Sequence, residues 1–402
     1  MTHALIIGGG IGGAVTAMAL KKAGVASTVY EAYPTGADDV GAFLSIMSNG
    51  LDGLRAIDAH QPVLDNSFPA NCVEFVAGSG KQLGAVPIGG QAGVLGPRTI
   101  KRAALYRVLH DEVARRGIEI EHGKRFTGAV TTSRDRVVAY FSDGSRAEGD
   151  LLVGADGIYS TTRRVIAAAA PVPRYLGMTT VCGYAANSPA TTPPGIYRMV
   201  YGRRAFFGYT TAPDGETWWF ASIPSPERSR DELAATTSEQ WRQRTVDLLT
   251  GDKAGTVDIV HATSQGIVGS SAYDIASTPV WHAGNMVLLG DAAHAASPSA
   301  GHGASMAIED GVVLAQCLRD LPNTEQAFQK FEQLRRERVE RLVVTSAKMT
   351  GRAIPGPVGR MIRDALLPMM LRKGPRNTSA WLTEYHIEWD TQVGLIGAAD
   401  VA

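Results

Sequence analysis

The sequence predicts an α/β fold in which a Rossmann-like domain is interrupted by a mostly antiparallel β-sheet domain and followed by C-terminal helices. Strand–turn–helix elements appear at the start of the chain, near 100–157 and near 285–318. The stretch from about 172 to 280 is instead rich in aromatic and β-forming residues, with a hairpin turn at Pro213-Asp214-Gly215. Glycines and prolines at 351–358 separate an amphipathic tail. A single interrupted domain explains this order better than consecutive domains do.

The expected domain boundaries follow these changes of character. Residues 1–70, 98–171 and 281–350 are expected to form the discontinuous nucleotide-binding domain. Residues 71–97 and 172–280 are expected to form the substrate-binding sheet, and 351–402 a C-terminal helical segment. Within the first domain, the pattern predicts a helix from Thr99, as its N-cap, to Arg116.

The N-terminus carries the fingerprint of a dinucleotide-binding βαβ unit. A short apolar run leads directly into G-x-G-x-x-G at Gly8, Gly10 and Gly13, and a second apolar run ends at Glu31. Gly8 allows the tight turn, Gly10 lets the backbone approach a pyrophosphate, and Gly13 lets the helix pack against the strand. The acid is placed to accept hydrogen bonds from ribose hydroxyls. These features predict a bound FAD or NAD.

Composition excludes several other classes of protein. The 402 residues have a formal net charge of zero, so no overall field attracts nucleic acid or an anionic membrane. The three cysteines are far apart, which fits neither a disulfide framework nor a metal site and favours a cytoplasmic setting. No apolar run reaches the roughly 18 residues of a membrane span, so no integral membrane association is expected. The first strand begins at once, so no signal peptide is expected.

Three separated motifs resemble those of one flavoprotein family. They are Gly8–Gly13 with Glu31, the run Gly154-Ala155-Asp156-Gly157, and the run Gly290-Asp291-Ala292-Ala293-His294 that continues to Gly301-His302-Gly303-Ala304. Their order and spacing are similar to those of single-component aromatic hydroxylases, FAD-dependent monooxygenases with a para-hydroxybenzoate hydroxylase-like fold. Arg102 matches the R-x-x-L-x-x-x-L helix of that family. The chain matches the compact members, which lack a thioredoxin-like C-terminal domain.

The resemblance implies a reaction. FAD, bound without a covalent link, would be reduced by NADPH or NADH and would capture O2 as a C4a-hydroperoxide. The distal oxygen would pass to an aromatic or polycyclic small molecule by hydroxylation or epoxidation, with natural-product metabolism as one setting. The protein would position the substrate and exclude water.

The resemblance also assigns residues. Backbone at Gly301 and Gly303 would stabilise reduced flavin, and Pro298 would position the hydroperoxide. Members commonly have Gln and Asn where this chain has His302 and Ser305, so side-chain roles there are left open. The residues expected to bind the cofactor are Gly8, Gly10, Ile11, Gly12, Gly13, Glu31, Arg102, Asp156, Gly157, Asp291, Gly303, Ala304 and Ser305.

Each of these residues also has a plainer interpretation. Asp156 and Asp291 could be turn or cap residues, and Pro298 could belong to an ordinary Ser-Pro-Ser turn. Arg102 could be a solvated surface cation. In the family, the residue matching His294 belongs to the motif without being the usual catalytic base.

The substrate is expected between the flavin and the middle sheet, where aromatic residues are dense. One face of alternate residues could line a flat pocket, while the other face must be core. The substrate candidates are Phe43, Met47, Phe207, Tyr209 and Trp219.

Three other functions remain open. A flavin-dependent halogenase shares the fold, but Trp218-Trp219-Phe220-Ala221-Ser222-Ile223-Pro224 does not match its W-x-W-x-I-P signature. A prenyl or alkene reductase would use the same FAD site without O2. A non-catalytic flavin-binding regulator would keep the motifs and lose the substrate pocket.

Overall fold

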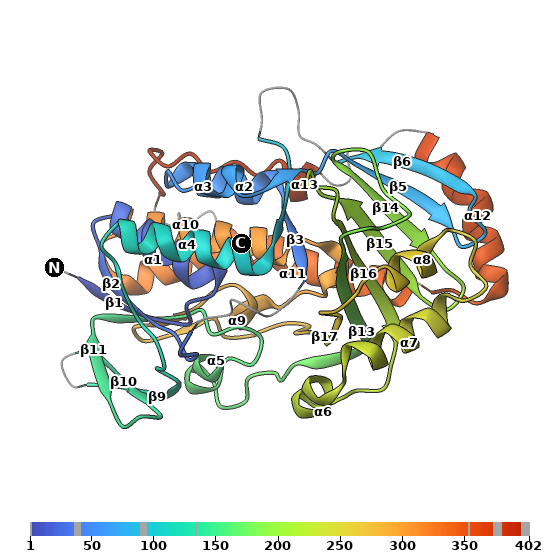
Figure 1. The fold of residues 1–402 in the computed structure, drawn as a ribbon. Coiled ribbons are helices and arrows are strands. Elements are labelled where there is room, and N and C mark those ends of the chain that lie inside the picture. Colours follow the sequence, from blue (N-terminus) through green and yellow to red (C-terminus); the bar gives the residue numbers. More distant parts are fainter. Residues whose placement is uncertain are drawn as a thin grey trace.

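A computed structural model describes residues 2–35, 42–88, 95–132, 135–352, 354–372 and 380–394. The predicted C-terminal segment 351–402 is therefore described only in part. Figure 1 shows two bodies of structure joined along one side, the first built on a parallel sheet and the second on a larger antiparallel one.

The first body is a six-stranded sheet with the predicted nucleotide-binding topology. Its strand order is β18 (His282–Ala283), β19 (Met286–Leu288), β12 (Leu151–Gly154), β1 (His3–Ile7), β2 (Ala26–Tyr30) and β8 (Glu119–Glu121). All neighbours are parallel except β18 and β19. Strands far apart in the chain thus lie side by side, as an interrupted domain requires.

Both faces of this sheet are covered. Ala4 and Ile6 face a helical layer that contains α1 (Ile11–Lys22), α2 (Ser48–Ala56), α4 (Arg102–Arg115) and α10 (Gly303–Asp320). Leu5 and Ile7 face a small antiparallel sheet of β9 (Phe126–Thr131), β10 (Val137–Phe141) and β11 (Arg146–Gly149). Because successive strand residues point to opposite faces, a strand covered on both sides reads as a continuous apolar run.

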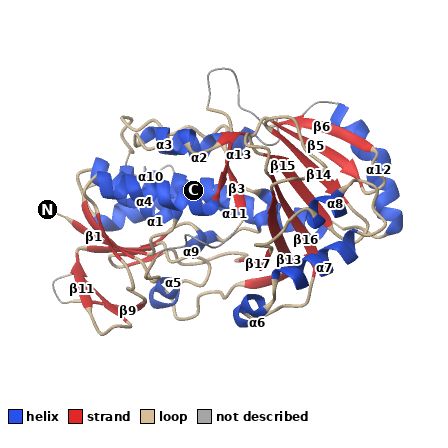
Figure 2. Cartoon of the chain, in the orientation of Figure 1, coloured by secondary structure: helices blue, strands red, loops and turns tan. Residues whose placement is uncertain are grey.

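The second body is a seven-stranded sheet. Its order is β17 (Val268–Asp274), β13 (Arg174–Ala185), β16 (Thr217–Pro224), β15 (Phe206–Thr211), β14 (Ile196–Tyr201), β5 (Cys72–Ala77) and β6 (Gln82–Pro87). Only β14 and β5 pair in parallel. Helices α7 (Ser238–Leu249) and α8 (Thr256–His261) cover one face, preceded along the chain by α6 (Arg230–Ala235). Figure 2 shows this concentration of strands beside the helical layer of the first body.

A third, small sheet lies between the two bodies. It contains β3 (Phe43–Ile46), β7 (Arg98–Lys101) and β4 (Phe68–Pro69). The Tyr197 hydroxyl of β14 hydrogen-bonds with Ser45 Oγ of β3 and Thr99 Oγ1 of β7, at 3.1 and 2.8 Å. Thr99 therefore belongs to a strand, and the expectation that it caps a helix is wrong: α4 starts at Arg102 with Lys101 as its N-cap.

The remaining elements complete the helical side and the tail. They are α3 (Gln61–Asp65), α5 (Thr161–Ile166), α9 (Asp291–His294), the 3-10 turn η1 (Pro298–Ala300), α11 (Thr324–Arg352), α12 (Pro357–Arg372) and α13 (Ala380–Thr383). Helix α11 packs along α10, and α12 packs on β6. Among the described helices, none has both the length and the apolar character needed to cross a bilayer.

Candidate functional site

The glycine-rich turn between β1 and α1 is built as its spacing predicts. Gly8 has φ +102°, and a Cβ there would lie 2.5 Å from the carbonyl oxygen of Ala155. A Cβ on Gly13 would lie 1.9 Å from the oxygen of Gly8, so this glycine is required by close packing. Beside Gly10, in contrast, nothing lies within 4 Å of the Cβ position. The start of α1 thus has open space where a phosphate could approach the helix N-terminus.

The next two residues position this helix start. Ile11 is the first residue of α1 and is partly buried against the main core. A Cβ on Gly12 would lie 3.0 Å from Cδ1 of Leu289, which brings the helix close to the end of β19.

Glu31 lies at the end of β2, as predicted, and its carboxylate already holds backbone groups. Oε2 accepts a hydrogen bond from Gly9 N at 2.7 Å, and Oε1 accepts one from Tyr33 N at 2.9 Å. A carboxylate has about four acceptor positions, so it can also accept from a ribose hydroxyl. The ribose contact stays a prediction; what the structure shows is that Glu31 fixes the glycine turn.

The Asp156-Gly157 motif lies directly against this turn, since a Cβ on Gly8 would be 2.9 Å from Cα of Asp156. The Asp156 carboxylate accepts hydrogen bonds from Ser160 Oγ, from the backbone N–H groups of Thr161 and Thr162, and from Thr162 Oγ1, at 2.5–3.0 Å. It therefore stabilises the start of α5, which is the plainer role that an aspartate fills. Gly157 adopts φ +73° with free space beside it. A direct cofactor contact at either residue stays a prediction.

Arg163 is a site residue that the sequence analysis missed. Its buried guanidinium donates to the carbonyl oxygen of Ala292 at 2.9 Å and to that of Ile158 at 2.7 Å. It therefore ties the second motif to the third. Arginine is rarely buried, so burial marks this residue in the structure. Nothing in the sequence indicates that it is buried.

Asp291 opens α9 and has a carboxylate without a partner. Its side chain is open to solvent, and no donor among the described residues lies within hydrogen-bond distance of it. Protein atoms nevertheless surround it closely enough that lost hydration raises the pKa of its carboxyl, against the opposing charges of His294 and Arg102. Gly303 lies beside it, with its Cβ position 3.9 Å from Asp291 Oδ1. Residues predicted from three segments thus meet here.

Arg102 occupies the first position of α4 and is exposed. Its charge acts on Asp291, so the two side chains belong to the same region.

The start of α10 is an uncapped helix end. Pro298 is exposed in η1, and Gly301 has φ +67°, a conformation that suits glycine. His302 is the N-cap, yet its side chain makes no capping hydrogen bond. Gly303 and Ala304 are partly open to solvent. Their N–H groups and the helix dipole favour negative charge at this point.

Ser305 differs from its neighbours. It is fully buried, and its Oγ accepts a hydrogen bond from Met47 N at 3.0 Å. A Cβ on Gly50 would lie 2.7 Å from that Oγ. The Ser305 side chain therefore holds α2 against α10, and only its backbone can serve a cofactor.

Behind the exposed start of α10 lies a buried network of charges. Asp310 Oδ2 accepts from Gly290 N at 2.9 Å and lies 2.5 Å from His294 Nε2, while Oδ1 accepts from Arg335 Nε at 2.7 Å. Burial opposes its ionisation, but His294 and Arg335 hold the pKa of the Asp310 carboxyl below its usual range. His294 thus has a structural partner in Asp310.

The network extends to α2 and α11. Glu309 makes ion pairs with Arg335 and Arg338, at 2.5 and 2.8 Å, and accepts from Asn49 Nδ2 at 2.5 Å. His302 lies close by, where burial lowers its pKa to about 4, so the ring is neutral at pH 7. Its Nδ1 is buried with no partner among the described residues.

The seven-stranded sheet turns one aromatic face toward the first body. Phe43 of β3 lies against it, with ring centroids 5.6–6.5 Å from those of Tyr184, Tyr197, Trp218 and Phe220. We call these five residues, with Met199 and Phe206 on the same side, the aromatic face. Met47, the other candidate from this segment, is 8% exposed and contacts Ser305 of α10 through its backbone. Of these two candidates, Phe43 is the one that lies on the aromatic face.

The three substrate candidates from the sheet point the other way. Phe207, Tyr209 and Trp219 are at most 1% exposed and pack in the core under α7 and α8. Phe207 stacks on Trp219 at 5.4 Å, and Trp219 Nε1 donates to Thr263 Oγ1. These three residues therefore cannot line a pocket over the aromatic face. Successive side chains of a strand point to opposite faces, so neighbours such as Phe206 and Phe220 lie on that face instead.

Lys101 and Glu216 border the aromatic face and were also missed. Lys101 Nζ lies 2.8 Å from Glu216 Oε2 and 4.4 Å from the centroid of the Tyr184 ring. Trp218 Nε1 donates to the same Glu216 oxygen at 2.8 Å. A charged pair therefore stands at one end of an otherwise apolar surface.

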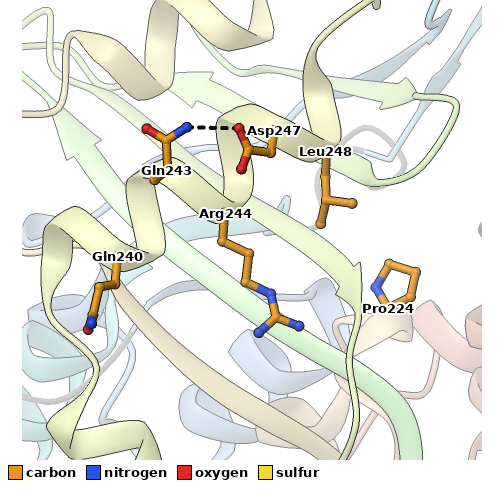
Figure 3. A pocket seen from close by; sticks show the side chains of 6 residues that line it. All are labelled: Pro224, Gln240, Gln243, Arg244, Asp247 and Leu248. Carbon is orange, nitrogen blue, oxygen red and sulfur yellow. Dashed lines mark hydrogen bonds between the residues drawn. The ribbon is translucent and has the colours of Figure 1, made fainter.

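A surface hollow of about 450 Å³ lies elsewhere, on α7 and the end of β16 (Figure 3). It is lined by Pro224, Gln240, Gln243, Arg244, Asp247 and Leu248, and Gln243 Nε2 donates to Asp247 Oδ1 one turn further along α7. Because α7 covers the opposite side of the sheet from the aromatic face, this hollow takes no part in the site.

Comparison with known proteins decides the family. Residues 1–346 match the model of the FAD binding domain family. The chain belongs to that family. This flavoprotein is 30% identical over 385 residues to aurachin C monooxygenase/isomerase of Stigmatella aurantiaca, covering 91% of this chain and 94% of that protein. It is 28% identical over 358 residues to FAD-dependent urate hydroxylase of Klebsiella pneumoniae, covering 86% and 88%.

A third relative and a solved structure are also similar to this chain. Zeaxanthin epoxidase of rice is 30% identical over 325 residues, which cover 77% of the flavoprotein and 48% of the epoxidase. The crystal structure of Klebsiella pneumoniae HpxO with FAD and uric acid superposes with a TM-score of 0.81 at 25% identity, over 92% and 93% of the two chains. The flavoprotein is accordingly an FAD-dependent monooxygenase, of a family that uses NAD(P)H and O2, with the predicted fold.

Proposed function

We propose that FAD lies across the three motifs, with its pyrophosphate at the start of α1 and its flavin at the start of α10. Three observations fit this group: the open space beside Gly10, the unpartnered carboxylate of Asp291, and the uncapped N-terminus at Gly303. The first suits a phosphate, the second a ribityl hydroxyl, and the third the negative charge of reduced flavin. Glu31 and Arg102 would serve the adenosine side.

The residues of the chain would hold and orient, while the cofactor supplies redox chemistry with NAD(P)H and O2. The N–H groups of Gly303 and Ala304 would stabilise charge near the flavin ring. Gly301 would serve in the same way through its backbone, and Pro298 would hold the loop that precedes it. The buried Asp310 network would hold this helix start rigid from behind.

We infer that the substrate is an aromatic or polycyclic small molecule bound over the aromatic face. The observation that carries this inference is the partial exposure of Tyr184, Met199, Phe206 and Phe220 on one side of the sheet, while their neighbours on the other side are sealed in core. Flat rings suit offset stacking on such a surface. The pair Lys101 and Glu216 would orient a polar group at one end.

Two further assignments are proposed. We propose the domain division given above, since β5 and β6 join β13–β17 in one sheet. We propose a cytoplasmic location, supported by the free thiols of Cys72, Cys182 and Cys317.

The test is a panel of aromatic compounds screened for stimulated NAD(P)H oxidation, with product masses measured. The proposal predicts a product heavier by one oxygen atom. Phe220→Leu should raise KM for that compound with FAD content unchanged. Tyr140→Leu, an exposed aromatic of β10, is the control and should change neither value. Halogenated or reduced products, or NAD(P)H oxidation that no compound stimulates, would favour the alternative functions.

A further inference from the structure

One face of helix α12 packs on the seven-stranded sheet, and among the described residues nothing covers its other face, which is apolar. Its inner face packs on β6, where Leu371 Cδ1 lies 2.7 Å from the Cβ position of Gly84. Arg363 on the same helix lies over the ring of Tyr201, 4.6 Å from its centroid. The outer face holds seven exposed residues that we call the α12 stripe: Val358, Met361, Ile362, Ala365, Leu366, Met369 and Met370.

The stripe is regular and strongly exposed. Its positions follow the i, i+3, i+4, i+7 spacing of one helix face, and all of them are apolar. The large side chains range from 49% exposed at Leu366 to 74% at Met361. They are six of the sixteen exposed large hydrophobic side chains in the described part of the chain. A contiguous exposed apolar patch of this kind marks an interaction surface.

Basic residues border the stripe. Arg203, Arg204 and Arg360 all act on the half-buried carboxylate of Asp252, so three cations share one acid. Arg360 Nη1 also donates to the carbonyl oxygen of Arg203 at 3.3 Å. Lys81 Nζ reaches the carbonyl oxygen of Asp364 at 3.3 Å. Arg363 is instead mostly buried and pairs with Asp364 of the same helix at 2.7 Å. We call Lys81, Arg203, Arg204 and Arg360 the basic rim.

We propose that the α12 stripe and the basic rim dock on an anionic lipid bilayer, with the helix lying in the plane of the surface. An apolar helix face with cations beside it is the pattern of interfacial helices. A second copy of the chain fits less well, because a symmetric contact would bring two identical basic rims together. Lipid phosphates supply the opposite charge instead.

A row of rings connects this surface with the aromatic face. Phe43 lies 6.1 Å from Phe220, Phe220 lies 6.1 Å from Phe206, and Phe206 lies 5.2 Å from Tyr201, on which Arg363 rests. Docking would therefore bring the bilayer to one end of the substrate surface. This link rests on the proposed function, whereas the docking itself is tested without substrate.

The experiment is flotation of the FAD-loaded full chain with vesicles. Vesicles containing phosphatidylglycerol should carry the protein upward, pure phosphatidylcholine should carry much less, and high salt should release it. Met361→Gln with Met369→Gln should lower binding by about tenfold, because two inserted apolar side chains become polar. Val130→Thr with Val172→Thr, also exposed, is the matched control and should bind as the parent does. Retained yellow colour confirms that each variant is folded.

Arg203→Gln with Arg204→Gln should reduce both binding and its salt dependence. Failure of the parent to float with anionic vesicles would overturn the proposal. So would equal flotation of the stripe variant. A dimer in sedimentation that the stripe variant converts to monomer, without vesicle binding, would instead assign the stripe to a second copy. None of these outcomes depends on turnover, so they are independent of the substrate proposal.

Discussion

Asp291 is the residue whose surroundings most clearly call for a ligand. Its carboxylate stands next to Gly303, feels the charges of Arg102 and His294, and accepts no hydrogen bond from the described residues. Nearby protein atoms raise the pKa of its carboxyl by reducing its hydration, although the side chain is open to solvent. A hydroxyl donor would satisfy it.

Asp291→Asn should therefore weaken FAD binding while the fold is kept. The loss of a charge-assisted hydrogen bond costs about 1.5–3 kcal/mol, or roughly ten- to a hundredfold in Kd. Titration of the apoprotein with FAD, followed by flavin fluorescence, measures this. Asp231→Asn, an exposed acid of α6, is the control. An unchanged Kd in the Asp291 variant would remove this residue from the cofactor site.

At the start of α10, two substitutions can distinguish the contribution of the backbone to flavin binding from that of the His302 side chain. His302→Gln should leave FAD binding and flavin reduction within a few-fold, because the ring faces the buried network. Gly303→Val should be much worse, since its side chain would fill the space beside Asp291; backbone strain plays no part, as Gly303 has no positive φ. Stopped-flow reduction by NADPH measures both. The reverse order of effects would point to a direct role for the imidazole.

At the scale of elements, buried charged side chains join α10 to α11. Removing any one of them would leave an opposite charge buried without its partner and destabilise the protein. Glu309, Asp310 and Arg335 are fully buried, and each carboxylate meets a cation within hydrogen-bond distance. Such a network positions the helix behind the proposed flavin site.

Arg335→Met should destabilise the protein by about 3–5 kcal/mol, because two carboxylates are left buried with fewer partners. Arg336→Met is the control: this neighbour on α11 pairs with Glu332 and Glu340 at a quarter exposure, where ion pairs contribute about 0–1 kcal/mol. Urea denaturation of the two variants compares them. Equal losses of unfolding free energy in the two variants would show that the buried network stabilises the protein no more than a surface ion pair does.

His302 should make stability depend on pH. Its pKa is about 4 in the folded protein and about 6.5 when unfolded, so the unfolded chain binds more protons between these values. Stability is thus full above pH 6.5 and falls by on the order of 3 kcal/mol as pH drops toward 4. Denaturation curves from pH 7 to 4.5 should show this slope, and His302→Gln should flatten it. A parallel slope in the variant would contradict the account.

The same elements show what sequence could and could not predict. The Gly8–Gly13 turn was correctly predicted to join a strand to a helix, and Glu31 and Asp291 to follow strands, because each signal is local. Their contacts with the cofactor stay predictions. The face of the seven-stranded sheet was not predictable, since Trp218, Trp219 and Phe220 give apolar residues on both sides. A sheet buried on both faces loses the alternation that fixes its register.

The buried network escaped prediction for a different reason. Asn49 and Glu309 are 260 residues apart, and Asp310 and Arg335 lie on different helices. Nothing in the chain marks such partners before folding. The same holds for Arg163, whose burial follows only from the meeting of the second and third motifs.

At the scale of the whole molecule, two bodies meet along the small sheet of β3, β7 and β4. The motifs lie at the ends of inner strands of the parallel sheet, and Phe43 of β3 packs against the other rings of the aromatic face. Because the family uses FAD, this arrangement predicts where the reaction takes place. We expect flavin reduction and oxygen transfer to occur between α10 and the aromatic face.

The most direct measurement is oxygen incorporation from isotopically labelled O2. The purified protein, with FAD that is released on denaturation, is mixed with NADPH or NADH and the compound that most stimulates NAD(P)H oxidation. The account predicts a product that carries one labelled oxygen atom. A colourless protein that cannot be reconstituted with FAD, or NAD(P)H oxidation in which every compound of the panel stays unlabelled, would contradict it.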